Sequence, residues 1–264
     1  MTPVRELDAA TCRALVGVFC DIDDTLTWDG RLVPEAFLGL KRLQDAGLRV
    51  VPVTGRPGGW VDAIARMWPV DGVVGENGGL WFYLDHHKMI RRFAQDEDVR
   101  RRNRERLDEL AGRILTRVPG AALASDQPYR DLDLAIDFRE DVPELGADAI
   151  DTIVTEFRAA GATCKVSSIH VNGWYGAFDK LAGCRALVRE RWATDLDADR
   201  DRWLFVGDSP NDEVMFAYFP GSIGVANVRR FSDRMTHLPR YVTEGVGGHG
   251  FVEVVDRVLA ARTD

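Results

Sequence analysis

The chain of 264 residues is poor in cysteine and has no long apolar run. Its cysteines, Cys12, Cys20, Cys164 and Cys184, are scattered without C-x-x-C spacing, which disfavours a zinc site and a disulfide framework. No stretch approaches the roughly 18 apolar residues of a membrane-spanning helix. The opening MTPVRELDAATCR lacks the apolar block of a signal peptide. We therefore expect a cytoplasmic protein with free thiols and no membrane partner.

Positive charge is also in short supply. The net charge is −8, which disfavours a general nucleic-acid binder. The basic cluster from Arg100 to Arg106 is interleaved with acids at i,i+4 spacing, as in Asp98 and Arg102, which is typical of a solvated helix face. Lysine is rare beside arginine, so each lysine is of interest.

The remaining composition, with 45% apolar and 29% charged residues, is ordinary for a chain that buries a core. Apolar strands alternate with helical segments up to about residue 79 and again after residue 179, which predicts βαβ units. Between them, a hairpin from about residue 80 (GLWFYL and KMIRRF), a charged helix over about 98–117 and a helix from Pro143 to Ala160 break this rhythm. We predict an α/β fold, a doubly wound parallel sheet formed by residues 1–92 and 173–264, with an inserted α+β domain over residues 93–172.

The stretch ALVGVFCDIDDT, residues 14–25, is the centre of the chemistry. The apolar run from Ala14 to Cys20 predicts a buried strand that stops at Asp21, and Asp23 would share the side of Asp21 on an extended chain. Two clustered carboxylates repel each other unless a cation or a shared proton relieves them. An EF-hand is excluded, because Leu26 and Leu32 stand where its glycine and its bidentate acid belong. A plain polar turn after a core strand stays an alternative.

Three further segments carry residues suited to phosphate-ester hydrolysis, which needs a nucleophile, a proton donor and positive charge. Thr54 ends a strand in V-T-G-R, Lys180 opens a helix in F-D-K, and Asp208 and Asp212 follow a strand in G-D-S-P-N-D. Each has a simpler explanation: a turn, a surface lysine, or an acid that favours a helix N-terminus.

These four segments, D-I-D-D-T, V-T-G-R, F-D-K and G-D-S-P-N-D, resemble in order the four motifs of haloacid dehalogenase-like phosphohydrolases. The position of the insert, the N-G-G at Asn77–Gly79 and the segment from Pro239 to Phe251 resemble the IIB (Cof-type) subclass. The resemblance implies a Rossmann-like catalytic core and an inserted cap domain that selects the substrate.

The resemblance also implies roles for individual residues. Asp21 would be the nucleophile, and Asp23 the acid that protonates the leaving group and later activates water. The groups that would hold the phosphoryl group are Thr54, Gly55, Lys180 and Asn211. The Mg²⁺ ligands would be Asp21, Asp208 and the backbone carbonyl of Asp23, with Asp212 helping directly or through water.

Substrate contacts are expected from the cap. Alternation along its last strand places Ser168, His170 and Asn172 on one face, which either lines a pocket or faces solvent. Asn77 is a further candidate. We expect a Mg²⁺-dependent phosphomonoester hydrolase, a phosphatase acting on a sugar phosphate or another small phosphorylated metabolite. The alternatives are a phosphosugar mutase and a non-enzymatic aspartyl phosphoacceptor, of which Asp23 disfavours the second. The oligomeric state stays open.

Overall fold

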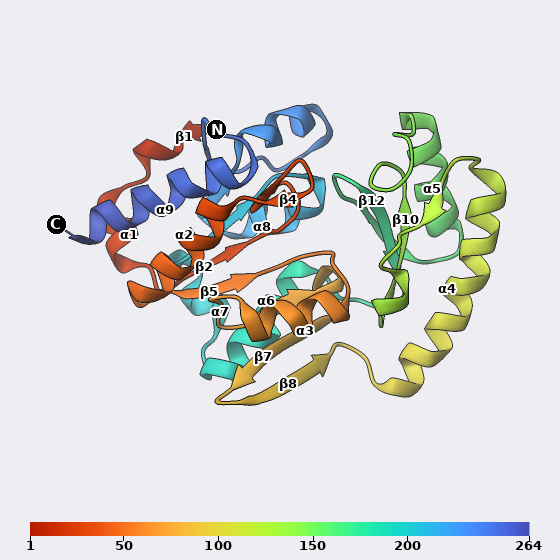
Figure 1. Ribbon diagram of the computed structural model, residues 1–264, viewed down its shortest axis with the longest axis horizontal. Helices are drawn as coiled ribbons and strands as arrows, with labels where there is room; N and C mark the ends of the chain where they lie inside the picture. The colour runs from red at the N-terminus through yellow and green to blue at the C-terminus, as the bar shows by residue number, and fades with distance from the viewer. Residues whose placement is uncertain (264) are drawn as a thin grey trace.

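The computed structural model describes residues 1–263 and has two lobes, each built around its own sheet (Figure 1). The elements of the larger lobe are β1 (Thr2–Pro3), α1 (Ala9–Ala14), β2 (Gly17–Cys20), β3 (Thr27–Trp28), β4 (Arg31–Leu32), α2 (Pro34–Asp45), β5 (Arg49–Pro52), α3 (Gly58–Met67), β6 (Val73–Gly75), β7 (Leu80–Asp85), β8 (Lys88–Phe93), α6 (Lys180–Trp192), α7 (Leu196–Asp199), β13 (Trp203–Gly207), α8 (Glu213–Tyr218), β14 (Gly221–Gly224), β15 (Tyr241–Val242) and α9 (Gly247–Thr263). Those of the smaller lobe are α4 (Glu97–Arg117), β9 (Ala122–Leu123), β10 (Asp133–Asp137), α5 (Ala147–Ala159), β11 (Thr163–Val166) and β12 (His170–Trp174).

The larger lobe contains a six-stranded parallel sheet in the order β1-β15-β14-β13-β2-β5. Strand β2 lies between β13 and β5, and Cys20 is level with Val206 on one side and Pro52 on the other. Because the strands are parallel, the residues that follow them emerge at the same edge. The predicted α/β fold with a parallel sheet is confirmed.

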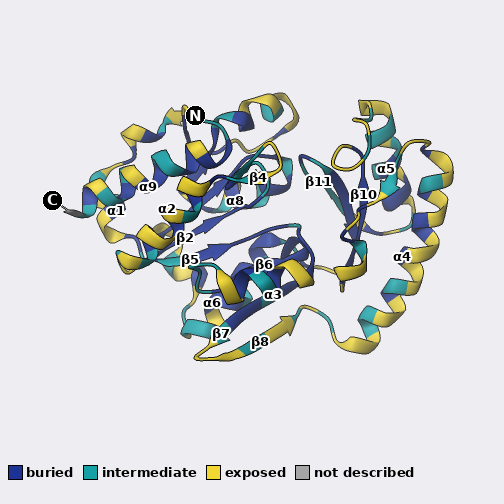
Figure 2. Cartoon of the chain, viewed as in Figure 1, coloured by how far each residue is buried: buried dark blue, intermediate teal, exposed yellow. Residues whose placement is uncertain are grey.

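The apolar character of β2 follows from burial on both faces of the sheet. Phe19 stacks on Trp203 at 4.5 Å between ring centroids on one face, whereas Val18 and Cys20 belong to the core of the other face. Helices α1, α2 and α9 pack on the face that carries Val18 and Cys20. Helices α6 and α8 pack on the face that carries Phe19 and Trp203. Figure 2 shows the strands buried between these helices, whose outer faces are exposed.

The predicted hairpin over residues 80–93 is present as β7 and β8, which form a small sheet with β6. A parallel bridge between Val53 and Val74 joins this small sheet to the end of β5. The hairpin therefore belongs structurally to the larger lobe.

The smaller lobe, which we call the inserted unit (α4 to β12), has an antiparallel sheet in the order β11-β12-β10-β9. Helices α4 and α5 pack on this sheet around their own apolar cluster, with Leu107, Ile114 and Phe157 fully buried. The domain boundaries at residues 93 and 172 stay a prediction, and β12 continues beyond the second one to Trp174.

Two predicted element boundaries are wrong. Ala14 was expected to begin the first strand, but it ends α1, whose N-cap Asp8 accepts a hydrogen bond from the Thr11 amide. The helix expected from Pro143 starts only at Ala147, because the Leu145 amide donates to Phe138 O and holds the preceding segment beside β10.

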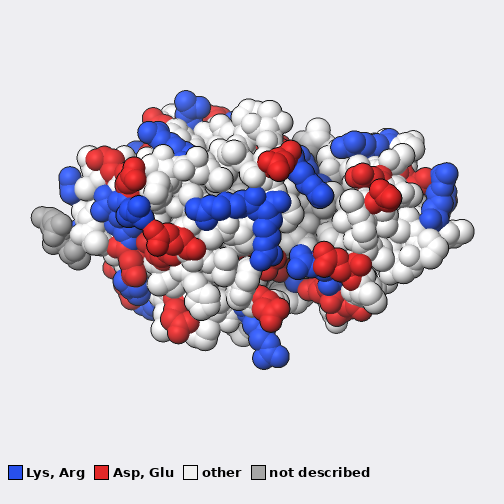
Figure 3. Space-filling view, turned by 90° about the horizontal axis from the view of Figure 1, so that it is seen from above, with Lys and Arg blue, Asp and Glu red and all other residues white. Residues whose placement is uncertain are grey.

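Helix hydropathy and the distribution of surface charge both bear on which partners the chain can have. Among residues 1–263, no helix combines the length and the apolar character needed to cross a bilayer. Seen from above, Figure 3 shows Lys and Arg interspersed with Asp and Glu on that face.

Candidate active site

Three aspartates meet at the carboxyl edge of the parallel sheet. Asp21 directly follows β2, Asp208 directly follows β13, and Asp212 ends the 3-10 turn Pro210–Asp212. One carboxylate oxygen from each lies within 4.8 Å of the others, and all three side chains are buried. The structure thus brings together the acids of the first and fourth sequence segments.

Lys180 is the cation of this cluster. It is the first residue of α6, a position set by the N-cap Asp179, whose carboxylate accepts from the Ala182 amide at 2.8 Å. Its Nζ lies 2.7 Å from Asp21 Oδ1 and 2.7 Å from Asp212 Oδ1, and its side chain is 1% exposed. The third predicted segment therefore also reaches the site.

The cluster carries more negative than positive charge, and this perturbs its ionisation. Burial raises the pKa of Asp21 to about 8, with Lys180 opposing the rise and Asp212 adding to it. Burial, Asp21 and Asp212 also raise the pKa of Asp208 well above its ordinary value. Burial lowers the pKa of Lys180, but Asp21 and Asp212 outweigh this effect and raise it. With all three carboxylates ionised, the single ammonium would leave two negative charges uncompensated, and a divalent cation would balance them.

The hydrogen bonds of the cluster leave an open acceptor. Asp212 Oδ2 accepts from the amides of Asp208 at 3.0 Å and Ser209 at 3.4 Å, while its Oδ1 faces Lys180. Asp208 Oδ2 accepts from Asn227 Nδ2 at 3.1 Å, whereas Asp208 Oδ1 is buried without a hydrogen-bond partner. An orphaned carboxylate oxygen beside Asp21 is a suitable ligand for a hard cation.

Asp23, two residues after Asp21, is paired with Arg56. Arg56 Nη2 lies 2.8 Å from Asp23 Oδ1, and Arg56 Nε lies 3.1 Å from both Asp23 oxygens, in a bidentate arrangement. Arg56 also contacts the inserted unit, through Glu140 at 2.6 Å and Asp126 at 3.3 Å. Burial lowers the pKa of Arg56, but Asp23 and Glu140 outweigh this effect and raise that pKa. Arg56 therefore orients Asp23 and links it to the inserted unit.

The predicted phosphoryl-binding groups lie at two depths. Gly55 and Asn211 line the cavity above Asp21. Thr54 lies deeper, fully buried, and its hydroxyl accepts from the Arg56 amide at 3.0 Å. Lys180 is also buried, and its Nζ forms the ion pair with Asp21 described above. A role for these residues in holding phosphate stays a prediction.

The N-G-G segment has a structural explanation. Asn77 adopts a left-handed conformation with φ 54°, and Gly78 follows with φ 100°. A Cβ on Gly78 would lie 1.8 Å from Asp179 O, so only glycine lets this turn pack against the start of α6. Asn77 Nδ2 is buried without a hydrogen-bond partner, close beneath Gly55, and Asn77 is absent from the cavity lining. Its role as a substrate contact stays a prediction.

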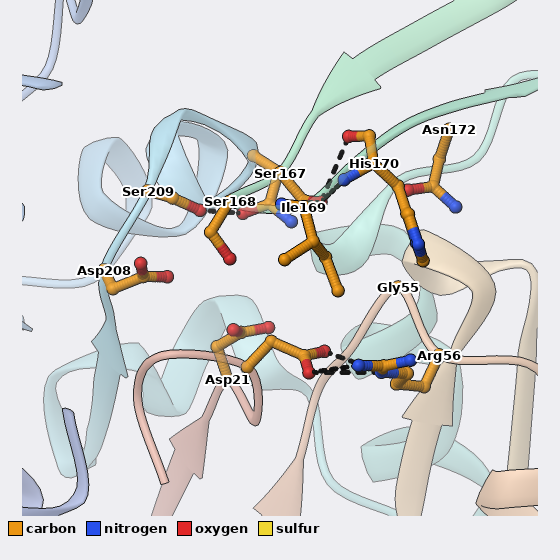
Figure 4. A pocket seen from close by; sticks show the side chains of 12 residues that line it. Asp21, Gly55, Arg56, Ser167, Ser168, Ile169, His170, Asn172, Asp208 and Ser209 are labelled. Atoms are coloured by element: carbon orange, nitrogen blue, oxygen red, sulfur yellow. Dashed lines mark hydrogen bonds and ion pairs between the residues drawn. The ribbon is translucent and has the colours of Figure 1, made fainter. Parts of the chain in front are cut away.

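The inserted unit covers the site with the turn before β12. Ser168, His170 and Asn172 line the cavity opposite Asp21 and Asp208, as Figure 4 shows. All three are buried, so the alternative of a solvent-facing edge is wrong.

These polar side chains already have partners within the protein. Asn172 Nδ2 donates to Asp133 Oδ2 at 2.9 Å, and His170 Nε2 lies 2.9 Å from Glu140 Oε2. Burial raises the pKa of Glu140, but hydrogen bonds from His170 and Arg56 outweigh it and lower that pKa to about 2. A role in reading the substrate stays a prediction.

The enclosed cavity is small. Between Asp21 and Ile169 its volume is about 10 Å³, space for about one water molecule. It adjoins an outer cavity of about 250 Å³ that shares Asp23, Arg56 and Ser168 and is also lined by Arg139. A phosphate group is larger than this inner space, so it does not fit beside Asp21 with the two lobes in this arrangement.

Sequence reasoning missed Arg56, Glu140 and Asn227. Arg56 stands within the quoted V-T-G-R, so its position directly after Thr54-Gly55 was an available signal. Glu140 and Asn227 lie in segments without a motif, and only the folded chain brings them to Arg56 and Asp208.

Comparison with known proteins agrees with this site. Residues 18–102 match the family of haloacid dehalogenase-like hydrolases. The phosphoglycolate phosphatase of Haloarcula marismortui is 31% identical over 253 residues, which are 89% of this chain and 93% of the relative. Phosphoglycolate phosphatase 1 of Saccharolobus solfataricus is 24% identical over 251 residues, 94% of this chain and 97% of the relative. The sucrose-phosphatase of Synechocystis sp. PCC6803, solved with sucrose and phosphate, has the same fold, with a TM-score of 0.64 at 16% identity over 93% of this chain and 98% of that chain.

The parallel sheet and the four segments at its carboxyl edge thus define a haloacid dehalogenase-like fold. The chain belongs to the haloacid dehalogenase-like hydrolases of the Cof type, and it is a phosphatase.

Proposed function

We propose that this phosphatase hydrolyses a small phosphomonoester through an aspartyl-phosphate on Asp21, with Mg²⁺ as cofactor. The observation that carries the proposal is the buried cluster of Asp21, Asp208 and Asp212 around Lys180, with Asp23 held beside it by Arg56. A cluster of this kind supplies a nucleophile, a proton carrier and a cation-binding site in one place.

Mg²⁺ fits the residues present. The donors are carboxylate oxygens, the ligands that Mg²⁺ prefers, and Asp208 Oδ1 is a buried acceptor without a partner. Asp21, Asp208 and the carbonyl of Asp23 would hold the ion, and Asp212, whose oxygens are engaged by Lys180 and two amides, would act through water. Bound there, Mg²⁺ would neutralise the repulsion between the phosphate and the attacking carboxylate.

In the first half-reaction, an oxygen of Asp21 attacks phosphorus. The bond between phosphorus and the leaving oxygen breaks as Asp23, in its protonated form, donates its proton to that oxygen. Lys180 neutralises charge on Asp21 and on the phosphoryl group. The product is an aspartyl-phosphate on Asp21 and a free alcohol.

In the second half-reaction, Asp23 is a carboxylate and acts as the base. It takes a proton from a water molecule, whose oxygen attacks the phosphorus of the aspartyl-phosphate. The bond from phosphorus to the Asp21 oxygen breaks, releasing inorganic phosphate and restoring the Asp21 carboxylate. Asp23 is again protonated for the next turnover.

The inserted unit would act as the cap, because it supplies the side chains that face the phosphoryl site from the other lobe. We propose phosphoglycolate as the first substrate to test, since curated relatives that match over most of their length carry that name. A sugar phosphate is the second candidate, favoured by the polar side chains around the cavity.

Phosphate release from a panel of metabolites with Mg²⁺ tests the proposal. We expect hydrolysis of 2-phosphoglycolate to exceed that of sugar monophosphates, with no release by the Asp21→Asn variant. Isomerisation of a sugar phosphate that depends on a sugar bisphosphate would instead reveal a mutase. A stable phosphoprotein without turnover would reveal a phosphoacceptor.

A further inference from the structure

Glu76 is a buried carboxylate that the phosphatase mechanism does not use. It belongs to the larger lobe, directly after β6, yet its main partners lie in the inserted unit. Its Oε1 accepts from the Asp131 amide at 2.8 Å, and its Oε2 accepts from the amides of Leu132 at 2.6 Å and Asp133 at 3.2 Å. Its Oε1 also accepts from the Gly58 amide at 3.0 Å, at the start of α3. One side chain thus ties residues 131–133, which lead into β10, to the larger lobe.

A second contact reinforces this junction from the opposite direction. Arg130 of the inserted unit donates from Nη1 to Gly55 O at 2.8 Å, in the turn between Thr54 and Arg56. Its guanidinium is fully buried between Asp126, at 2.9 Å, and Asp133, at 3.0 Å. Because Asp126 also contacts Arg56, the junction reaches the arginine that holds Asp23.

Two glycines of α3 allow the lobes to approach here. A Cβ on Gly58 would lie 2.8 Å from Asp131 Oδ2, and a Cβ on Gly59 would lie 3.0 Å from Tyr129 Cβ. Alanine would otherwise be favoured in the first turn of a helix. Glycine at these two positions therefore lowers helix propensity but permits close contact with the inserted unit.

Both chain crossings between the lobes lie beside the same junction. The Ala94 amide donates to Gly79 O at 2.8 Å, and Asp179 O packs against Gly78, next to Glu76 and Asn77. The turn over Asp21 is contributed by residues 167–170, at the other end of β12. A lobe held at its crossings can swing only at its far end, which here is the end that covers the catalytic aspartates.

We propose that Glu76 is a positioning residue, whose carboxylate anchors the start of β10 and makes this junction the pivot on which the inserted unit closes over Asp21. The anchored segment sets the position of Arg130, and through Asp126 that of Arg56. Closure then returns residues 167–170 to the same place after each substrate enters. The inference does not depend on which phosphomonoester is the natural substrate.

The test is Glu76→Gln, which places an amide NH₂ against backbone donors that need an acceptor. Leaving such buried donors unsatisfied should speed hydrogen exchange at Leu132 and Asp133 by about 10-fold or more. Exchange in α9 should not change. With p-nitrophenyl phosphate as probe, KM should rise several-fold, an effect that a smaller folded fraction cannot produce. The matched control is Glu253→Gln, since Glu253 also accepts from two backbone amides, those of Glu244 and Gly245, but within the larger lobe.

Wild-type exchange at Leu132 and Asp133 in Glu76→Gln, or faster exchange there with an unchanged KM, would overturn the proposal. Should this variant fail to fold, the double variant Gly58→Ala/Gly59→Ala decides. It leaves Glu76 intact and places methyl groups between α3 and the inserted unit. Faster exchange at residues 131–133 and a raised KM would support the pivot, and wild-type values for both would refute it.

Discussion

Lys180 relieves only part of the repulsion among the carboxylates around Asp21, and this predicts how Asp21→Asn affects turnover and stability. Asp21→Asn removes the nucleophile, so turnover should fall by at least about 1,000-fold. The amide oxygen can still accept from Lys180, and repulsion with Asp208 and Asp212 disappears, so the unfolding temperature should equal or exceed that of the wild type.

Phosphate release and thermal unfolding of the same preparation check this outcome. Asp29→Asn is the matched control, because Asp29 lies in the turn between β3 and β4, is exposed, and has φ 53°, which asparagine tolerates. Retention of substantial turnover by Asp21→Asn would exclude Asp21 as the nucleophile.

The two carboxylates at the end of β2 can be separated by leaving group. Asp23→Asn should lose about 100-fold or more on 2-phosphoglycolate, whose alkoxide leaves badly without a proton. It should lose less on p-nitrophenyl phosphate, since nitrophenolate needs little protonation to depart. Steady-state kinetics on both substrates measure the difference. Equal losses on the two would leave no evidence for an acid role of Asp23.

Sequence reasoning found the site residues whose type and spacing the reaction requires. It missed the residues that reach the site only through long-range packing. Asp21, Lys180 and Asp208 follow apolar strands or open a helix, where side-chain type and spacing carry information. Glu140 reaches Arg56 across the two lobes, a contact between residues 84 positions apart that no local pattern encodes. Asn172 lies on the predicted face, yet it donates to Asp133, and alternation alone cannot reveal such a partner.

At the level of elements, the central strands β2, β5 and β13 were predictable because each is a short, mainly apolar run. The residues at which elements begin and end were harder to predict. The delayed start of α5 depends on the bond from Leu145 to Phe138, which a propensity argument does not contain. The order of strands in the inserted unit likewise depends on long-range pairing between β10 and β12.

The contacts of Glu140, which follows β10, with Arg56 and His170 predict a dependence of stability on pH. The folded-state pKa of Glu140 is about 2, below its ordinary value of 4.5, because its hydrogen bonds to His170 and Arg56 outweigh burial. A depressed carboxylate pKa stabilises the fold fully above pH 4.5, and this stabilisation is lost as pH falls toward 2. Glu140→Gln should therefore be less stable than wild type at neutral pH and show a shallower loss of stability between pH 4.5 and 2.

Chemical denaturation at several pH values measures this slope. Glu144→Gln is the control, since Glu144 pairs with Arg139 at 3.6 Å in an exposed position and should contribute little. Parallel stability curves for wild type and Glu140→Gln would contradict the assignment.

At the scale of the whole molecule, cation binding should be visible without any substrate. Because the cluster of Asp21, Asp208 and Asp212 exists only in the folded chain, Mg²⁺ at 100-fold its dissociation constant should stabilise the protein by about 2.7 kcal/mol. EDTA should remove both this gain and the activity, and added Mg²⁺ should restore them. Asp208→Asn should lose the gain, whereas Asp201→Asn, at an exposed position, should keep it. An unfolding temperature that is the same with and without Mg²⁺ would argue against a metal site in this cluster.

The central claim is that phosphate passes through Asp21, and trapping the intermediate tests it most directly. Rapid quenching during turnover, reduction with borohydride and peptide mass spectrometry convert an aspartyl-phosphate into homoserine at its own position. We predict homoserine at position 21 in the wild type and none in Asp21→Asn. Homoserine at position 23 or 208, or unmodified Asp21 during steady turnover, would contradict the account.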